Sequence, residues 1–185
     1  MVRGEEMMID TAPALKPEDL GNHTLDVALA YLGSGLSIIP VARDGTKQPD
    51  ARLLPREYDD DTGHFKATWN PFKDHVRNGE RVPGRLPTEK EVQDWFGRPN
   101  PPGIGVIGGA VSGGLECLDF DTRAEQIFRA WCEMVESEAP GLLAKLSIAK
   151  TPKPGYHVRY RCSEVSIPGN TKLAEDPALP PKERT

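Results

Sequence analysis

The chain has 185 residues, of which 37% are hydrophobic and 28% charged, and its formal net charge is −5. This length favours one domain with a hydrophobic core, and no stretch approaches the roughly 20 apolar residues of a membrane span, so we expect no membrane partner. Cys117, Cys132 and Cys162 are widely spaced, which argues against a disulfide scaffold or a zinc site and favours a reducing, cytoplasmic setting.

The N-terminal part of the chain predicts a helix that leads into a strand. Residues 1–23 have no periodic pattern, so we expect a disordered leader rather than a secretory signal. Thr24 is a candidate N-cap for a helix whose apolar residues repeat at three- and four-residue steps up to Leu32. Leu36–Val41 is then predicted to be a short buried strand, which completes an αβ unit.

Residues 42–87 carry few signals of regular structure and include the acidic run Asp59–Asp61. A loop of this length in a small domain is often functional or partly disordered. Regular structure is expected again at Thr88, which forms a capping box with Glu91 at the start of a helix that runs through Phe96.

Two strands are predicted on either side of a glycine-rich turn, at Ile104–Ile107 and Leu115–Asp121. We expect them to pair as a hairpin. The segment Gly103–Gly108 also satisfies GxGxxG, but a dinucleotide site needs a helix to open within that pattern, and here its interior is a strand. The glycines are better explained by a tight turn.

A second helix and two more strands complete the pattern. Thr122 and Glu125 indicate a capping box, and the helix that follows carries an apolar stripe built on residues such as Phe128 and Trp131. Strands are predicted at residues 146–149 and 156–162. The order of strand, strand, helix, strand, strand predicts an α+β fold with a mainly antiparallel sheet flanked by helices.

The strand LECLDFD contains the strongest candidate for chemistry. Because side chains alternate along a strand, Asp119 and Asp121 share one face, opposite Leu118 and Phe120. Two neighbouring carboxylates repel unless a cation lies between them, and hard oxygen ligands suit Mg²⁺ or Mn²⁺. The alternative is that Asp121 begins the next helix while Asp119 faces solvent; we expect a buried strand, where an unpaired charge is costly, and this argues against it.

The strand YHVRYR contains the second candidate. Alternation places His157, Arg159 and Arg161 on one face, where their donors could hold a triphosphate. A histidine considered alone is more often an ordinary surface or core residue, and it is the two arginines in line with it that favour a binding role. Cys117, on the Asp119 face, is interpreted as a packing residue.

Basic residues gather around these strands although the chain is acidic overall. Lys150, Lys153 and Lys172 belong to a segment from Lys145 that carries six basic residues and the single acid Glu164. This segment fits a phosphate-bearing ligand, but lysines and arginines that protect a solvated strand edge would give the same pattern. Lys47 is either a solvated lysine or a phosphate contact.

Four ordered segments between Thr24 and Arg161 together resemble the N-terminal domain of bifunctional DNA primase-polymerases, a family of the archaeo-eukaryotic primase superfamily found in phages, plasmids and mobile elements. They are GLSIIPV followed by Lys47 and Pro49, PTEKEVQDWF, GIGVIGGAVSGGLECLDFD and TPKPGYHVRYR. The resemblance implies an RRM-like palm with an N-terminal αβ unit over residues 24–172, followed by a tail over residues 173–185.

The resemblance also assigns roles to residues. The DxD motif falls on Asp119 and Asp121 as ligands of catalytic Mg²⁺ or Mn²⁺, and the second motif, a small residue, any residue and His, places His157 on the nucleotide phosphates. Lys47 matches a basic position near the nucleotide. The third motif, an acid in a later strand, has no match, because Asp176 lies between Glu175 and Pro177 in the tail. We therefore expect a domain that is incomplete at its C-terminus and catalyses little alone.

The expected function is template-directed nucleotidyl transfer in DNA replication, with a DNA template and primer, nucleoside triphosphates, and a fused or associated helicase as partners. The missing third acid favours an alternative, a non-catalytic nucleotide- or DNA-binding module of a replication initiator or helicase. A glycosyltransferase would also use DxD, but the histidine–arginine strand argues against it.

Overall fold

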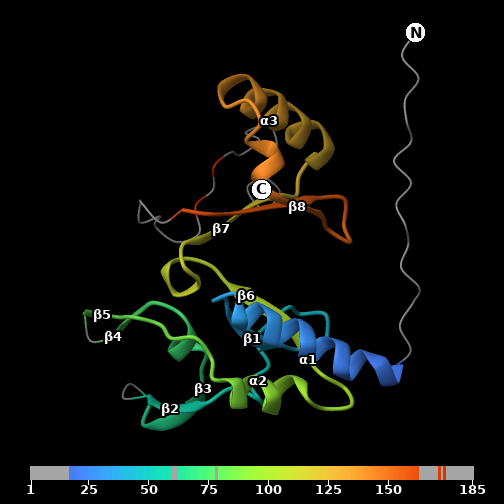
Figure 1. Ribbon diagram of the computed structural model, residues 1–185. Helices are drawn as coiled ribbons and strands as arrows, with labels where there is room; N and C mark the ends of the chain where they lie inside the picture. Colours follow the sequence, from blue (N-terminus) through green and yellow to red (C-terminus); the bar gives the residue numbers. More distant parts are fainter. Residues whose placement is uncertain (1–16, 60–61, 78, 163–170, 172, 174–185) are drawn as a thin grey trace.

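The computed structural model describes residues 17–59, 62–77, 79–162, 171 and 173 (Figure 1). Its α-helices are α1 (Pro17–Gly33), α2 (Glu89–Phe96) and α3 (Ala124–Glu138). Its strands are β1 (Ser37–Val41), β2 (Arg56–Asp59), β3 (His64–Ala67), β4 (His75–Arg77), β5 (Glu80–Val82), β6 (Gly103–Ile107), β7 (Leu115–Phe120), β8 (Ser147–Lys150) and β9 (Tyr156–Arg161). Among the helices of the described residues, none combines the length and the apolar character needed to cross a bilayer.

The α+β class predicted from the sequence is confirmed, but the strands do not form one sheet. Within the described residues they form three antiparallel pairs, β1–β6, β2–β3 and β4–β5, and a three-stranded sheet in the order β7–β9–β8. The structure thus contains two packed units, one around β1 and β6 and one around the three-stranded sheet. Figure 1 shows the sheet between α3 on one side and the β1–β6 unit on the other.

The β1–β6 unit holds the main hydrophobic core. The apolar residues of α2 are spaced so that Val92, Trp95 and Phe96 share one face, and all three are buried. The rings of Trp95 and the fully buried Phe72 form a T-shaped pair at a centroid distance of 5.2 Å. The predicted capping box is confirmed, because Thr88 accepts from the Glu91 backbone N–H while the Glu91 carboxylate accepts from the Thr88 N–H.

Two predictions for the N-terminal part need correction. The helix begins at Pro17 rather than after a cap at Thr24, so part of the predicted leader is helical; residues 1–16 lie outside the described residues. The segment 42–87 is more regular than expected, since it contains the β2–β3 and β4–β5 hairpins and a 3₁₀ turn, Asn70–Phe72, whose phenylalanine anchors it to the core.

The predicted hairpin of the strands now labelled β6 and β7 is wrong. β6 pairs with β1, β7 pairs with β9, and a single bridge between Gly109 and Leu115 connects the two segments. The reason is local geometry: Gly109, Gly113 and Gly114 all have positive φ, and the 3₁₀ turn Ala110–Ser112 between them carries the chain from one unit to the other.

α3 covers one face of the three-stranded sheet. Phe120 meets Phe128 and Trp131 of α3 at centroid distances of 5.4 and 5.5 Å, and Tyr156 stacks on Phe128 at 4.0 Å. Val158, on the same face of β9, is fully buried. The predicted alternation along YHVRYR is therefore confirmed for these residues: Tyr156 and Val158 lie on the side of α3, and His157 and Arg159 lie on the opposite face.

The capping box predicted at the start of α3 is wrong. The N-cap is Arg123, in the left-handed region with φ 47°, and its side chain makes no capping hydrogen bond. The Glu125 carboxylate instead accepts a hydrogen bond from the Tyr156 hydroxyl, which raises the pKa of that tyrosine and ties α3 to β9. Ile127 and Met134, also apolar residues of α3, are 37% and 55% exposed, so Phe128 and Trp131 supply most of the contact.

Candidate nucleotide and metal site

Asp119 and His157 meet on the sheet face that α3 leaves open. They are direct partners in the antiparallel register of β7 and β9, so their side chains project from the same face. Asp119 Oδ1 lies 3.3 Å from His157 Nε2. The strands thus bring together the carboxylate and the imidazole that the sequence singled out separately.

Arg159 extends this pair along β9. Its Nη2 lies 3.2 Å from His157 Nδ1. Because a guanidinium has donors only, this contact fits the imidazole tautomer with its hydrogen on Nε2, which is then directed at Asp119. Carboxylate, imidazole and guanidinium therefore form one row across two strands, with acceptor oxygen at one end and positive charge at the other.

Asp121 lies just beyond the end of β7, next to the start of β9. A Cβ atom at Gly155 would be 3.6 Å from Asp121 Oδ1 and 2.8 Å from the carbonyl oxygen of Phe120. Gly155 thus has no room for a side chain, which is a physical reason for a small residue two positions before His157. The second carboxylate of the DxD motif is therefore close to the turn that positions the histidine.

The environment of Asp119 differs from the sequence-based expectation. We expected a buried strand in which an unpaired charge is costly, yet the Asp119 side chain is 52% exposed and His157 is 34% exposed. The reason is that only one face of β7 is covered by α3. Exposure leaves the carboxylate accessible to ligands from solvent, and a polar contact with His157 at so exposed a position adds little to stability.

The predicted basic residues are distributed over different parts of the molecule. Lys150 lies above the Tyr156 ring, 5.7 Å from its centroid, and so belongs to the α3 side of the sheet rather than to the Asp119 face. Lys153 is exposed in the turn between β8 and β9. Arg161 lies in line with Arg159, but its guanidinium donates to backbone carbonyls of Ser34 and Ser112.

Lys47 belongs to the β1–β6 unit. It lies in the turn after β1, with φ 58°, where the chain returns to pair Pro49 with Val41. Lys172 and Asp176 lie outside the described residues.

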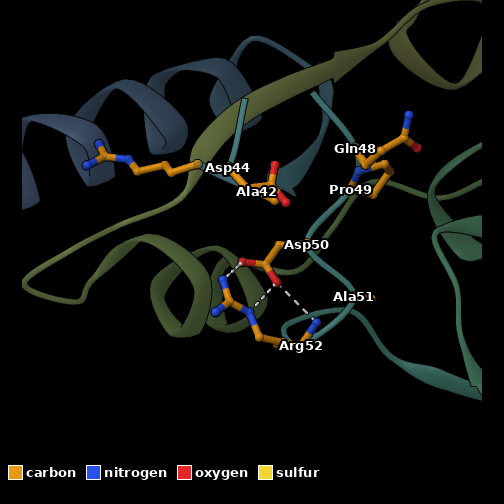
Figure 2. Close-up of a pocket in the computed structure, with 8 residues that line it drawn as sticks. Ala42, Asp44, Gln48, Pro49, Asp50, Ala51 and Arg52 are labelled. Atoms are coloured by element: carbon orange, nitrogen blue, oxygen red, sulfur yellow. Dashed lines mark hydrogen bonds and ion pairs between the residues drawn. The ribbon is translucent and has the colours of Figure 1, made fainter. Parts of the chain in front are cut away.

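A hollow of about 490 Å³ is formed by this same loop, over residues 42–44 and 48–52. Figure 2 shows Arg52 folded back onto Asp50. Arg52 Nε donates to Asp50 Oδ1 at 2.8 Å, and Nη2 donates to Oδ2 at 2.7 Å. The two bonds hold the pKa of the buried Asp50 below its usual range. No lining residue comes from β7 or β9, and the arginine is engaged within the loop, so we place the candidate site at Asp119 and His157 instead.

The residues present fit a divalent cation that substrate helps to hold. Within the described part of the chain there is no group of three or more His, Cys, Asp or Glu side chains able to form a complete metal cage. Mg²⁺, however, is usually held by one or two carboxylates together with substrate phosphates and water. Asp119 and Asp121 supply that number of carboxylates, beside a row of donors suited to phosphate.

The chain also matches a known protein family. The model of the family described as bifunctional DNA primase/polymerase, N-terminal, matches residues 28–180, which is most of the chain. The chain belongs to this family. Searches of curated proteins and of solved structures found no match. At family level, the Prim-Pol match implies nucleotidyl transfer of the DNA primase/polymerase type, with DNA and nucleotides as substrates.

Sequence reasoning missed Ser112 in this Prim-Pol domain. It is fully buried, accepts a hydrogen bond from the Ser37 backbone N–H at 2.8 Å and donates to the Ile107 carbonyl. A serine among four glycines is typical of a turn, and no local signal in the sequence distinguishes this buried role from a solvated one.

Proposed function

We propose that this domain carries out template-directed nucleotidyl transfer in DNA replication, using Asp119, Asp121 and His157. The observation that carries the proposal is the direct pairing of Asp119 with His157 across β7 and β9 in a Prim-Pol chain. The three-stranded sheet with α3 on one face would serve as the palm, and the unit around β1 and β6 as the N-terminal αβ unit.

Asp119 and Asp121 would hold Mg²⁺ or Mn²⁺. When bound, these cations lower the pKa of the attacking 3′-hydroxyl and neutralise charge on the triphosphate and the departing pyrophosphate. The carboxylates themselves orient the incoming nucleotide by fixing where its phosphates can bind. Asp119 is already half exposed on the open face, so it needs no local unfolding to reach them.

His157 and Arg159 would bind the phosphates. The Nε2 hydrogen of His157, now directed at Asp119, is the donor nearest to the carboxylate, and a phosphate oxygen would compete for it. Arg159 stays beside the imidazole and adds a permanent positive charge, which stabilises negative charge as it develops in the transition state.

Lys47 and Lys153 are proposed to contact nucleotide or DNA from outside this row. Both are exposed, and the loop with Lys47 belongs to the other unit. We also propose a cytoplasmic setting, supported by three free cysteines, and a fused or associated helicase as the partner that presents the template.

The competing proposal is a non-catalytic nucleotide- or DNA-binding module. What favours it is that the described residues supply two carboxylates and no third acid beside them. Binding of DNA without a requirement for metal, and without synthesis by the complete gene product, would favour this module over the enzyme.

Primer extension by the full-length protein tests the enzyme directly. We expect Mg²⁺- or Mn²⁺-dependent synthesis that is lost in Asp119→Ala and in Asp121→Ala. The matched control is Asp94→Ala, which removes an exposed acid of α2 that belongs to neither β7 nor β9. Undiminished synthesis in both site variants would end the proposal.

A further inference from the structure

Arg161, the last residue of β9, reaches from the three-stranded sheet to the other unit. Its Nη1 donates to the Ser112 carbonyl at 2.6 Å and lies 3.3 Å from the Gly113 carbonyl. Its Nη2 donates to the Ser34 carbonyl at 2.9 Å, at the end of α1 and 127 residues away in sequence. One side chain therefore links β9 to two separate segments of the β1–β6 side of the molecule.

The attachment point at Ser112 is tied into the β1–β6 unit by hydrogen bonds. Ser112 is fully buried, and its hydroxyl joins the backbone of Ser37 at the start of β1 to Ile107 at the end of β6. The Ser37 hydroxyl in turn donates to the Phe72 carbonyl at 2.7 Å in the core. The guanidinium thus holds the sheet against a network that extends into the main core of the neighbouring unit.

The turn under Arg161 is shaped for this contact. Gly113 is in the left-handed region with φ +64°, and a Cβ atom there would collide with Arg161 Nη1. Only glycine therefore allows the close approach. The flat guanidinium holds two amino groups in a fixed fork, so Nη1 and Nη2 each reach a carbonyl in a different place; the three donors of lysine sit on one nitrogen, which cannot occupy both positions.

The backbone bonds between the units lie in the same region. Gly109 donates to Leu115, and Cys162, directly after Arg161, donates to Gly114 at 2.8 Å. These bonds join the sheet to the connecting turn itself, whereas the Arg161–Ser34 bond reaches α1. Without it, the described hydrogen bonds would leave the sheet attached near one connecting turn, about which it could rotate.

We infer that Arg161 is a positioning residue that fixes the orientation of the Asp119–His157 face relative to the β1–β6 unit. It acts through backbone carbonyls and has no part in binding phosphate. For catalysis, this orientation would determine how the loop with Lys47 lies relative to a nucleotide held by Asp119. That consequence rests on the function proposed above, whereas the orientation itself does not.

Distance measurements between spin labels test the orientation independently of activity. In the full chain with Cys117, Cys132 and Cys162 replaced by serine or alanine, labels on Gln93→Cys in α2 and Glu133→Cys in α3 report the distance between the two units. We expect one narrow distribution in the parent protein. In Arg161→Met it should broaden and gain a second population, and in Arg161→Lys it should broaden less, because one carbonyl contact can be kept.

A matched control is Arg129→Met, which removes an exposed arginine of α3 and should leave the distribution narrow. If Arg161→Met does not fold, as judged by far-UV circular dichroism, the distance distribution of Arg161→Lys is the test instead. A distribution as narrow as that of the parent in whichever folded variant is measured would overturn the inference.

Measurement of kcat and KM connects the orientation of the sheet to the proposed reaction. For a nucleotidyltransferase, misplacement of the site by about 1 Å costs on the order of 10²-fold in rate. We therefore expect kcat to fall by that order in Arg161→Met, with a smaller change in the KM for nucleotide, because no phosphate contact is removed. A raised KM with unchanged kcat would instead assign Arg161 to phosphate binding and overturn the inference.

Absence of synthesis by the parent would count against the proposed function, while the distance measurement would still decide the role of Arg161.

Discussion

Asp119 lies directly opposite His157 in the β7–β9 pair, with 3.3 Å between Asp119 Oδ1 and His157 Nε2. Because the carboxylate is half exposed, the pair contributes little to the fold. We predict that Asp119→Asn changes the free energy of unfolding by less than about 1 kcal/mol, measured by urea denaturation. A loss of several kcal/mol would mean that the pair serves the fold rather than a ligand.

Gly155 is predicted to be intolerant of a side chain. A Cβ atom there would be 2.7 Å from Thr151 Oγ1 and 2.8 Å from the Phe120 carbonyl oxygen, so Gly155→Ala should destabilise the domain by about 1–3 kcal/mol. The control is Gly33→Ala at the end of α1, where no heavy atom lies within 4 Å and the change should be neutral or slightly stabilising. Equal thermal unfolding of the two variants would contradict the crowding at Gly155.

Phe72 is predicted to be essential to the fold despite its position in a segment with few sequence signals. It is fully buried against Trp95, and Phe72→Ala should cost about 3–5 kcal/mol. Phe65→Ala is the matched control, because that ring is 59% exposed on the β2–β3 hairpin. Chemical denaturation should separate the two variants clearly, and similar costs would argue that the Asn70–Phe72 turn is not anchored in the core.

The capping box predicts an acid-sensitive contribution to stability. Hydrogen bonds from Arg85, together with those from Thr88, lower the pKa of Glu91 from 4.5 to about 2. Since the folded pKa is depressed, the stabilisation is present above pH 4.5 and is lost as the pH falls towards 2. Its size is on the order of 1–3 kcal/mol, because the Glu91 side chain is only 25% exposed.

Urea denaturation at a series of pH values measures this contribution. Glu91→Gln should be less stable than the wild type at neutral pH, and the two curves should converge towards pH 2. Glu89→Gln, at an exposed position in the same helical turn, should run parallel to the wild type. A constant difference between Glu91→Gln and the wild type at every pH would rule out the ion pair with Arg85 as its cause.

Local signals predicted the parts of the fold that depend on neighbouring residues. The α2 capping box involves Thr88 and Glu91, three positions apart, and the alternation of β9 needs only the strand itself. The α3 cap failed although its spacing was correct: the N-cap is Arg123, and the Glu125 carboxylate accepts a hydrogen bond from Tyr156 instead. A contact 31 residues away therefore outweighed a local preference.

Strand pairing and the site needed information that local patterns do not contain. β6 and β7 are neighbours in sequence, yet each pairs with a distant strand, and the glycine turn between them does not reveal this. Alternation placed Arg161 on the same face as Arg159. The hydrogen bond from Arg161 to the Ser34 carbonyl, however, depends on where α1 ends in space. The pairing of Asp119 with His157 likewise follows from register and not from either motif alone.

Asp119 and Asp121 are proposed to hold a divalent cation together with a nucleotide beside His157. Electron paramagnetic resonance of Mn²⁺, titrated into the protein with a deoxynucleoside triphosphate, measures this without requiring catalysis. We predict binding that weakens by more than about 10-fold in Asp119→Asn and in Asp121→Asn, and that is unchanged in Asp94→Asn. Equal Mn²⁺ affinity in all four proteins would rule out this metal site.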